Sequence, residues 1–517
     1  GYLALSAATA GYDNVAVGGE ALASNTAINN TAVGHKSAYT NTTGTQNSAL
    51  GTYSLFANTE GDFNTAVGYT ALATNTTADN NTAIGHKALN LNTTAGDNTA
   101  VGTSALLSNT TGAENTAVGF EALRNNTTGT PNNAFGRQAL RLNSTGGANC
   151  AFGEQALQSN TTASNNTAFG HQALTANTTG ASNVAVGYLA LDANTTASYG
   201  TAIGHQALSA NTTGTQNTAV GAAALQAATT AAANTAVGYG CLGAATTGAS
   251  NTAMGALALN ANTTGTQNTA VGESALVTTT TGGYNTAMGR EALKYNTTGQ
   301  FNVAMGRTSL TSNTTGAYNV AIGYTALNAA TTASTNTAVG SQAGEKITTG
   351  PNNVLVGNKA GANMTTGDNN TAVGPFAMGD GTTTGGTNTA IGYAALYSLS
   401  SGSDNLALGR DAGRSGSPGG EVTTGSYKVS VGGSNINSAN IQVDWTVASD
   451  ARDKTDFTAL DLGLDFVNAL APVTYKWDKR ANYGDKYAEG YDLNAQTPDG
   501  THKEDWLDIG FKAQEVE

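Results

Sequence analysis

The chain has 517 residues, of which only 11% are charged and 66 are glycine, and its formal net charge is −13. This acidity argues against electrostatic binding to nucleic acid. No run of 18 apolar residues occurs, so the sequence predicts no membrane-inserted helix. The two cysteines, Cys150 and Cys241, are too few for a disulfide framework and too far apart for a CxxC motif.

A 17-residue segment repeats through residues 1–413, with the consensus N-T-A-V-G-x-x-A-L-x-x-N-T-T-G-x-x. We number its positions from the first Asn, as at Asn14, Asn64 and Asn405, and recognise about 24 copies. Gly1 fits position five of an earlier copy, so we expect the array to continue upstream. Position four is apolar in every copy and position nine is usually Leu. Such fixed apolar positions argue against a disordered low-complexity tract.

Seventeen residues are too few for a helix pair or a propeller blade, and they suit one coil of a β-solenoid. T-A-V is predicted to be a strand that turns at the following Gly. The x-x-A-L-x-x stretch, as at 121–124, could be a second strand or one helical turn, and its Ala, Leu, Gln and Glu residues favour the helical turn. N-T-T-G is predicted to be a loop. Coils stacked about 4.8 Å apart would make a rod of roughly 115 Å.

Neighbouring side chains of a strand point to opposite faces. We expect position four, such as Val67, to point into the coil, and position three, such as Ala66, to point outward. A continuous outward stripe of small apolar residues predicts contact with other copies of the chain, and we expect a homotrimer. The alternative is a narrow coil in which both columns face one interior.

The segments N-T-A-V-G, N-T-A-I-G and N-V-A-M-G resemble the head repeats of trimeric autotransporter adhesins. That resemblance implies a trimeric left-handed β-roll. The chain differs from those heads in its longer period and in its A-L-x-x-N-T-T-G insert. Late copies return toward the shorter style, with A-G in place of A-L, as at 343–344.

Position six carries four of the five histidines, but in other copies it carries Tyr, Phe, Arg or Glu: the histidines are His35, His86, His171 and His205. This variety indicates an exposed, tolerant position, so the sequence predicts no metal site and no cofactor. Tyrosines at the same position would offer rings for a glycan to stack on. N-T-T matches the glycosylation sequon, although an internal Asn ladder accounts for it equally well.

Residues 414–448 are predicted to be a Gly/Ser linker with a short β stalk. The linker is 414–420, and strands are expected at 427–431 and 441–445. Apolar spacing predicts a helix at 460–470, which Pro472 ends, followed by a strand at 471–477.

Three ordered motifs occupy 449–517: S-D-x-R-x-K, then G-L-D-F-V-N-A-L-A-P-V-T-Y-K-W, then G-F-K-A-Q-E-V-E. Together they closely resemble the self-cleaving intramolecular chaperone of phage endosialidase-type tailspikes and tail fibres. The resemblance implies Ser449 as nucleophile and Lys454 as its base, with Asp450 and Arg452 as matching motif members. It also implies a small, trimeric α+β domain that helps the upstream fibre to fold. Because family members run further, we expect the domain to be truncated at Glu517.

The predicted function is therefore a trimeric phage tail fibre, in the virion or at a cell surface, that reaches toward a host receptor such as a glycan. Its enzyme activity would be at most a single self-cleavage next to Ser449. Two alternatives stay open. One is a bacterial surface adhesin that carries the same chaperone. The other is a glycan-depolymerising tailspike whose catalytic domain lies outside this sequence.

Overall fold

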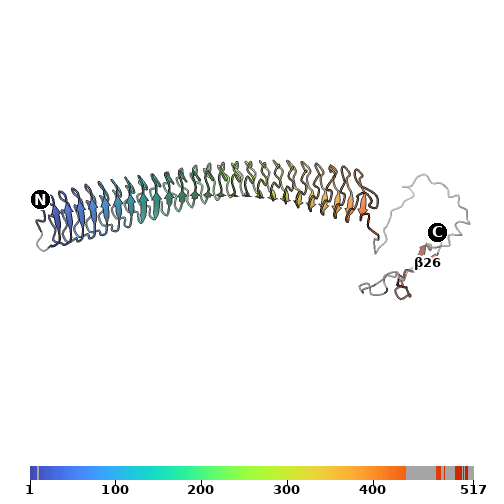
Figure 1. Cartoon of the computed structure of the whole chain (residues 1–517), viewed down its shortest axis with the longest axis horizontal. Coiled ribbons are helices and arrows are strands. Elements are labelled where there is room, and N and C mark those ends of the chain that lie inside the picture. Colours follow the sequence, from blue (N-terminus) through green and yellow to red (C-terminus); the bar gives the residue numbers. More distant parts are fainter. Residues whose placement is uncertain are drawn as a thin grey trace. The chain divides into compact units, whose positions relative to one another are not determined.

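The computed structural model describes residues 1–7, 11–437, 473–478, 483, 495–503, 505 and 507–510. The chain divides into two compact units, Gly1–Asn437 and Ser438–Glu517. The first unit is an elongated stack of coils, each contributing one short strand (Figure 1). Within the described residues all regular elements are strands, and no helix long and apolar enough to cross a membrane is found there. The predicted β-solenoid is confirmed.

The first unit carries one parallel sheet of 25 strands. Successive strands pair in register, so that Ala66 of one coil lies opposite Ala83 of the next. The strands are β1 (Val15–Val17), β2 (Thr31–Val33), β3 (Ser48–Leu50), β4 (Thr65–Val67), β5 (Thr82–Ile84), β6 (Thr99–Val101), β7 (Thr116–Val118), β8 (Asn132–Phe135), β9 (Asn149–Phe152), β10 (Thr167–Phe169), β11 (Val184–Val186), β12 (Thr201–Ile203), β13 (Thr218–Val220), β14 (Thr235–Val237), β15 (Thr252–Met254), β16 (Thr269–Val271), β17 (Thr286–Met288), β18 (Val303–Met305), β19 (Val320–Ile322), β20 (Thr337–Val339), β21 (Val354–Val356), β22 (Thr371–Val373), β23 (Thr389–Ile391), β24 (Leu406–Leu408) and β25 (Val429–Val431).

The core of the coils is narrow, and in most of them it is filled by Ala at positions three and eight and by Leu at position nine. Ala66, Ala71 and Leu72 are all fully buried. The expected orientation of the strand is therefore wrong, because position three points inward and position four, such as Val67, points outward. The alternative in which both columns face the interior is also wrong. Only the small Ala fits beside Leu inside so thin a coil.

The segment expected to form a helical turn is instead a wider bend, stacked on the next coil. Thr70 and Leu72 both have φ near +51°, which a right-handed helix does not allow. The Leu72 N–H donates to the Ala88 carbonyl of the next coil at 2.9 Å rather than within its own coil. A left-handed Leu costs about 1–2 kcal/mol. Burying its side chain returns about 1.5–3 kcal/mol.

Glycine at position five is required by the stacking. Gly68 has φ +135°, and a Cβ there would lie 2.5 Å from the Gly85 carbonyl oxygen of the next coil. The same conflict recurs along the stack, for example at Gly170. Any other residue would be strained and would separate the coils.

Two ladders of buried Asn side chains run along the coils, at positions one and twelve. The Asn75 amide donates to the Asn58 side-chain oxygen at 2.8 Å and to the Ala78 carbonyl at 2.9 Å. In the position-one ladder, the Asn64 backbone N–H donates to Asn47 Oδ1 of the preceding coil at 2.9 Å. Because Asn75 is fully buried, its N-T-T sequence belongs to an internal ladder, as the sequence allowed.

The last coil is longer than the others, since Leu406 of β24 pairs with Val429 of β25. Residues 414–420 lie within this enlarged coil, and the strand expected at 427–431 forms at β25. In the second unit, β26 (Val473–Tyr475) pairs antiparallel with β27 (Asp508–Gly510). The strand expected at 471–477 therefore forms at β26. The strand expected at 441–445 and the helix at 460–470 lie outside the described residues.

Candidate functional site

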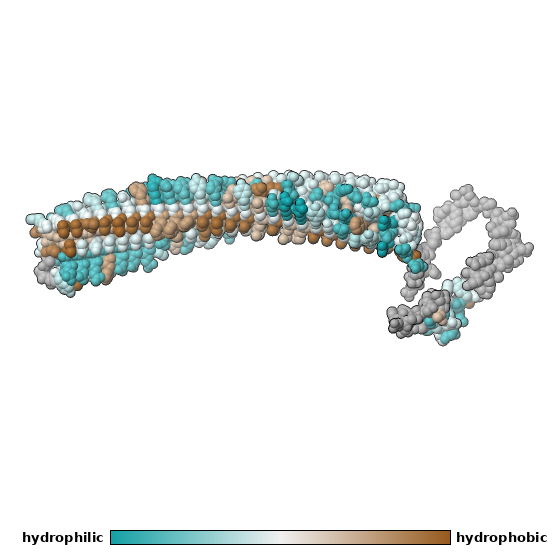
Figure 2. Space-filling model, viewed as in Figure 1, coloured by the Kyte–Doolittle hydropathy of each residue, from teal (hydrophilic) through white to brown (hydrophobic). Residues whose placement is uncertain are grey.

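The most extended surface feature is the outer face of the sheet, which we call the sheet face and define as positions two and four of β1 to β25. Position four is Val, Ile, Leu, Met or Phe in every strand, and position two is mostly Thr or Val. Neither column contains a charged residue. In the space-filling view a brown apolar band follows the rod between paler and teal surfaces (Figure 2).

The position-four side chains of the sheet face stay open to solvent along the array. Leu50 is 51% exposed, Phe169 57% and Ile391 43%. The position-four side chains range from part-buried, as at Val67, to about half exposed, so at about 40 Å² of apolar surface each the 25 strands present roughly 1,000 Å². That exceeds the apolar patch of a typical monomer, and it matches the roughly 800 Å² that each partner buries in a stable interface.

The outward stripe thus exists, but its residues are not those that the sequence predicted. It consists of the larger side chains of position four, and the Ala column lies in the core. The signal for this was present in the repeat. Ala is almost invariant at position three, as a tight interior demands, whereas position four varies from Val67 to Phe135.

Three consecutive coils carry a ridge of phenylalanines on the sheet face, which we call the Phe ridge: Phe135, Phe152 and Phe169. Their rings stack with centroids 4.3 Å and 5.6 Å apart. In two of the same coils position two also departs from the consensus, with Asn133 and Cys150. Cys150 is a free, partly buried cysteine, and burial raises the pKa of its thiol. The Phe ridge is the one part of the sheet face that carries aromatic side chains.

Position six forms a separate aromatic column at the edge of the coil. His171, Tyr188 and His205 stack with centroid separations of 5.6 Å and 5.3 Å. Since each ring covers the face of the next, mainly ring edges remain for a sugar to contact. The described residues contain no group of three or more His, Cys, Asp or Glu placed to bind a metal.

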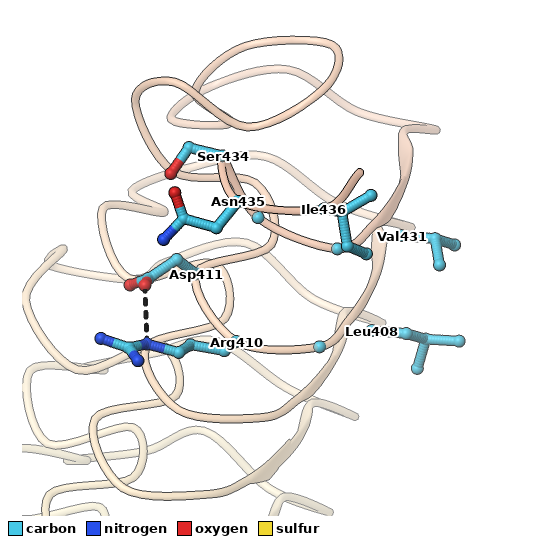
Figure 3. Close-up of a pocket in the computed structure, with 10 residues that line it drawn as sticks. Leu408, Arg410, Asp411, Val431, Ser434, Asn435 and Ile436 are labelled. Carbon is cyan, nitrogen blue, oxygen red and sulfur yellow. Dashed lines mark hydrogen bonds and ion pairs between the residues drawn. The ribbon is translucent and has the colours of Figure 1, made fainter. Parts of the chain in front are cut away.

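A cavity of about 450 Å³ lies at the last coil (Figure 3). Arg410 and Asp411 form an ion pair at 3.2 Å on one side, while Ser434 and Asn435 face them. Here the stack loosens, because a Cβ on Gly409 would lie 3.3 Å from Gly432 rather than about 2.5 Å from a carbonyl oxygen. The cavity therefore marks the point where regular stacking ends, and its lining holds no paired nucleophile and base.

The predicted site residues Ser449, Asp450, Arg452 and Lys454 lie outside the described residues, so their geometry stays a prediction. The backbone nearby does bring two of the three motifs together. Val473 of β26 lies opposite Gly510 of β27, which joins the second motif to the start of the third.

Residues 449–517 match the family model described as the chaperone of endosialidase. The C-terminus of the chain matches this chaperone family. The match confirms the resemblance expected from the three motifs, and we call residues 449–517 the chaperone segment. No curated protein and no solved structure matches the chain. A long parallel β-solenoid followed by a chaperone segment is an arrangement that fits a tailspike or tail fibre.

Proposed function

We propose that the chain is the shaft of a homotrimeric, receptor-directed fibre of the phage-tail type, assembled with the help of its chaperone segment. The observation that carries this proposal is the uncharged apolar sheet face, which extends along the whole array. A face of this length needs a partner of equal length with apolar groups at the same spacing. Another copy of the same chain meets that requirement coil by coil.

The chaperone segment, at the C-terminus of the chain, supports the same proposal. Parallel copies of a repetitive face have to be aligned before they can pack, and a domain that associates first brings the chains together. Removing that domain afterwards would make separation of the chains kinetically slow, because the aligning element is gone.

We place the cleavage chemistry at Ser449. Its hydroxyl oxygen would attack the carbonyl carbon of an adjacent peptide bond, while the Lys454 amine takes the hydroxyl proton and passes it to the leaving amine. Water would then hydrolyse the resulting ester, which restores the Ser449 hydroxyl, leaves a carboxyl group and separates the two parts of the chain. Lys454 can do this only if burial or neighbouring positive charge lowers its pKa, so that its amine is neutral near pH 7. Arg452 of the same motif would supply such a charge.

The oligomer is tested by light scattering of the chain. We expect three times the mass of one 51.6 kDa chain. Three aspartates on the sheet face should produce monomers, because burying unpaired carboxylates is costly: Val186→Asp, Val220→Asp and Val237→Asp. Three aspartates in exposed loops of nearby coils are the matched control and should leave the trimer intact: Thr196→Asp, Thr213→Asp and Thr230→Asp. A monomeric unmodified chain would refute the proposal.

Self-cleavage is tested by denaturing electrophoresis of the chain expressed with whatever natural sequence follows Glu517. We expect a shortened fibre that ends beside Ser449. Ser449→Ala and Lys454→Ala should each preserve the full-length chain, whereas the control Ser434→Ala should cleave normally. Equal cleavage of the Ser449→Ala chain would remove Ser449 from the mechanism without affecting the trimer, which is measured separately.

A further inference from the structure

We infer that the Phe ridge sets the axial register between the chains of the fibre. This inference rests on the proposed trimer and adds to it a specific element that distinguishes correct from slipped alignment. It is carried by the place of Phe135, Phe152 and Phe169 on the sheet face and by the regularity of the face on either side.

Most of the sheet face does not define a register. A chain displaced by one coil, about 4.8 Å, would present an almost identical pair of columns to its neighbour. After the ridge, for example, position four reads Val186, Ile203, Val220 and Val237, and position two of the same four strands is Val or Thr. Such a displacement changes side-chain volumes little and loses only the contacts of one coil at an end.

The Phe ridge breaks this equivalence. It begins after Val118 and ends before Val186, so rings are flanked by smaller side chains on both sides. In register, the rings of all chains meet at the same levels. After a one-coil displacement, Phe135 of one chain faces Val118 of its neighbour, and Val186 faces Phe169. A ring is too large for a space that fits two valines, and a valine leaves a void in a space that fits two rings. The stacked rings cannot easily adjust, since Phe135 and Phe152 lie only 4.3 Å apart.

The methionines of the sheet face do not offer the same discrimination. Met254, Met288 and Met305 are the other bulky side chains of position four. Methionine is unbranched and flexible, and it fills irregular gaps with little loss. They are also interrupted by Val271, so they form no continuous ridge.

The chain contains its own reporter of register. Cys150 occupies position two of β9 on the sheet face, at the level of Phe152. The other cysteine, Cys241, is fully buried inside its coil and is removed by Cys241→Ala without touching the face. A disulfide forms only when the two Cα atoms lie within about 7 Å, so an axial offset of one coil strongly reduces its yield.

The experiment coexpresses two differently tagged chains, both with Cys241→Ala. The first keeps Cys150, and the second carries Cys150→Thr and Thr167→Cys, which moves the thiol up by one coil. After mild oxidation, disulfides within one chain type report correct register, and disulfides between the two types report a one-coil slip. We expect the between-type product to be at least about tenfold rarer in the native background.

The test variant replaces the ridge in both chains with Phe135→Val, Phe152→Val and Phe169→Val. These side chains lie outside the coil core, where Ala134, Ala151 and Ala168 remain buried, so each coil should still fold. We expect the between-type product to rise to within about twofold of the within-type product, because slipped and correct registers become nearly equivalent.

The matched control removes a second set of three stacked rings that lies outside the sheet face: Tyr284→Ala, Phe301→Ala and Tyr318→Ala. These three positions have φ near +60°, which Ala adopts at the same repeat position in Ala148 and Ala233. These rings stack with centroids 4.8 Å and 5.0 Å apart. Their removal should leave the disulfide pattern unchanged.

The outcomes separate the inference from the proposed trimer. A monomer by light scattering removes the trimer and the inference together. A trimer whose disulfide pattern is unaffected by the ridge variant overturns the inference alone. A trimer that forms no disulfide, or equal amounts of both products in the native background, also overturns it, because the face would then not hold neighbouring chains at one level.

Discussion

The Asn ladder at position twelve contains interruptions that can be repaired. Each Asn amide normally donates to the side-chain oxygen of the Asn one coil earlier, as Asn126 does to Asn109 Oδ1 at 2.9 Å. Where the next coil lacks Asn, the last oxygen of the ladder is left buried without a partner. This occurs at Asn262, where Thr279 follows. The amide of Asn296 reaches Thr279 Oγ1 only at 3.5 Å.

We expect Thr279→Asn to stabilise this part of the array. The new amide would donate to Asn262 Oδ1 and to the Gly282 carbonyl, and its oxygen would accept from Asn296. A buried unsatisfied acceptor costs about 1–3 kcal/mol, so satisfying it stabilises the fold by that amount. The conformational entropy lost when the new side chain is ordered offsets part of this stabilisation. We therefore expect about 1–2 kcal/mol of added local stability, which corresponds to roughly 5–30-fold slower amide exchange.

Hydrogen exchange with mass spectrometry on the full chain is the appropriate assay, because a long repeat array need not unfold in one step. Peptides spanning 262–296 report the effect. Ala228→Asn is the matched control: it satisfies Asn211 Oδ1, but its own oxygen would face Ala245 and become the new unpaired acceptor. Exchange in the Thr279→Asn chain that is no slower than in the control would refute the ladder argument.

Three further predictions concern the coil core. Gly170→Ala should separate its coil from the next one, because the new Cβ would lie 2.4 Å from the Gly187 carbonyl oxygen. Gly19→Ala should be tolerated, because the nearest atom to its new Cβ is 3.4 Å away. Hydrogen exchange should therefore become faster around residue 170 in the first variant and stay unchanged around residue 19 in the second. Leu123→Ala should cost about 2–5 kcal/mol locally, seen as faster exchange of its coil. Burial raises the pKa of Cys241 to about 11, so at pH 8 only about one thiol in a thousand is ionised, and iodoacetamide should label it only after denaturation.

Several features of this chain follow from the sequence alone. The constant period and the uniform Gly at position five, as at Gly68, predict one coil per repeat, because identical coils can stack only if each turns in the same way. The buried Asn ladder follows from Asn side chains repeated at one level of every coil. The chaperone segment is recognisable from three ordered motifs, although Ser449 and Lys454 lie outside the described residues and their roles remain a prediction.

The tertiary structure decided which side of each strand faces the core. Strand alternation requires that Ala66 and Val67 point to opposite faces, but it does not say which of the two is inside. The thickness of the coil settles that, because only Ala leaves room for Leu72 in the core. The same stacking overrides helix propensity at position nine, where the Leu72 N–H bonds to the next coil. Contacts between coils are nonlocal, and a local pattern contains neither their distance nor their direction.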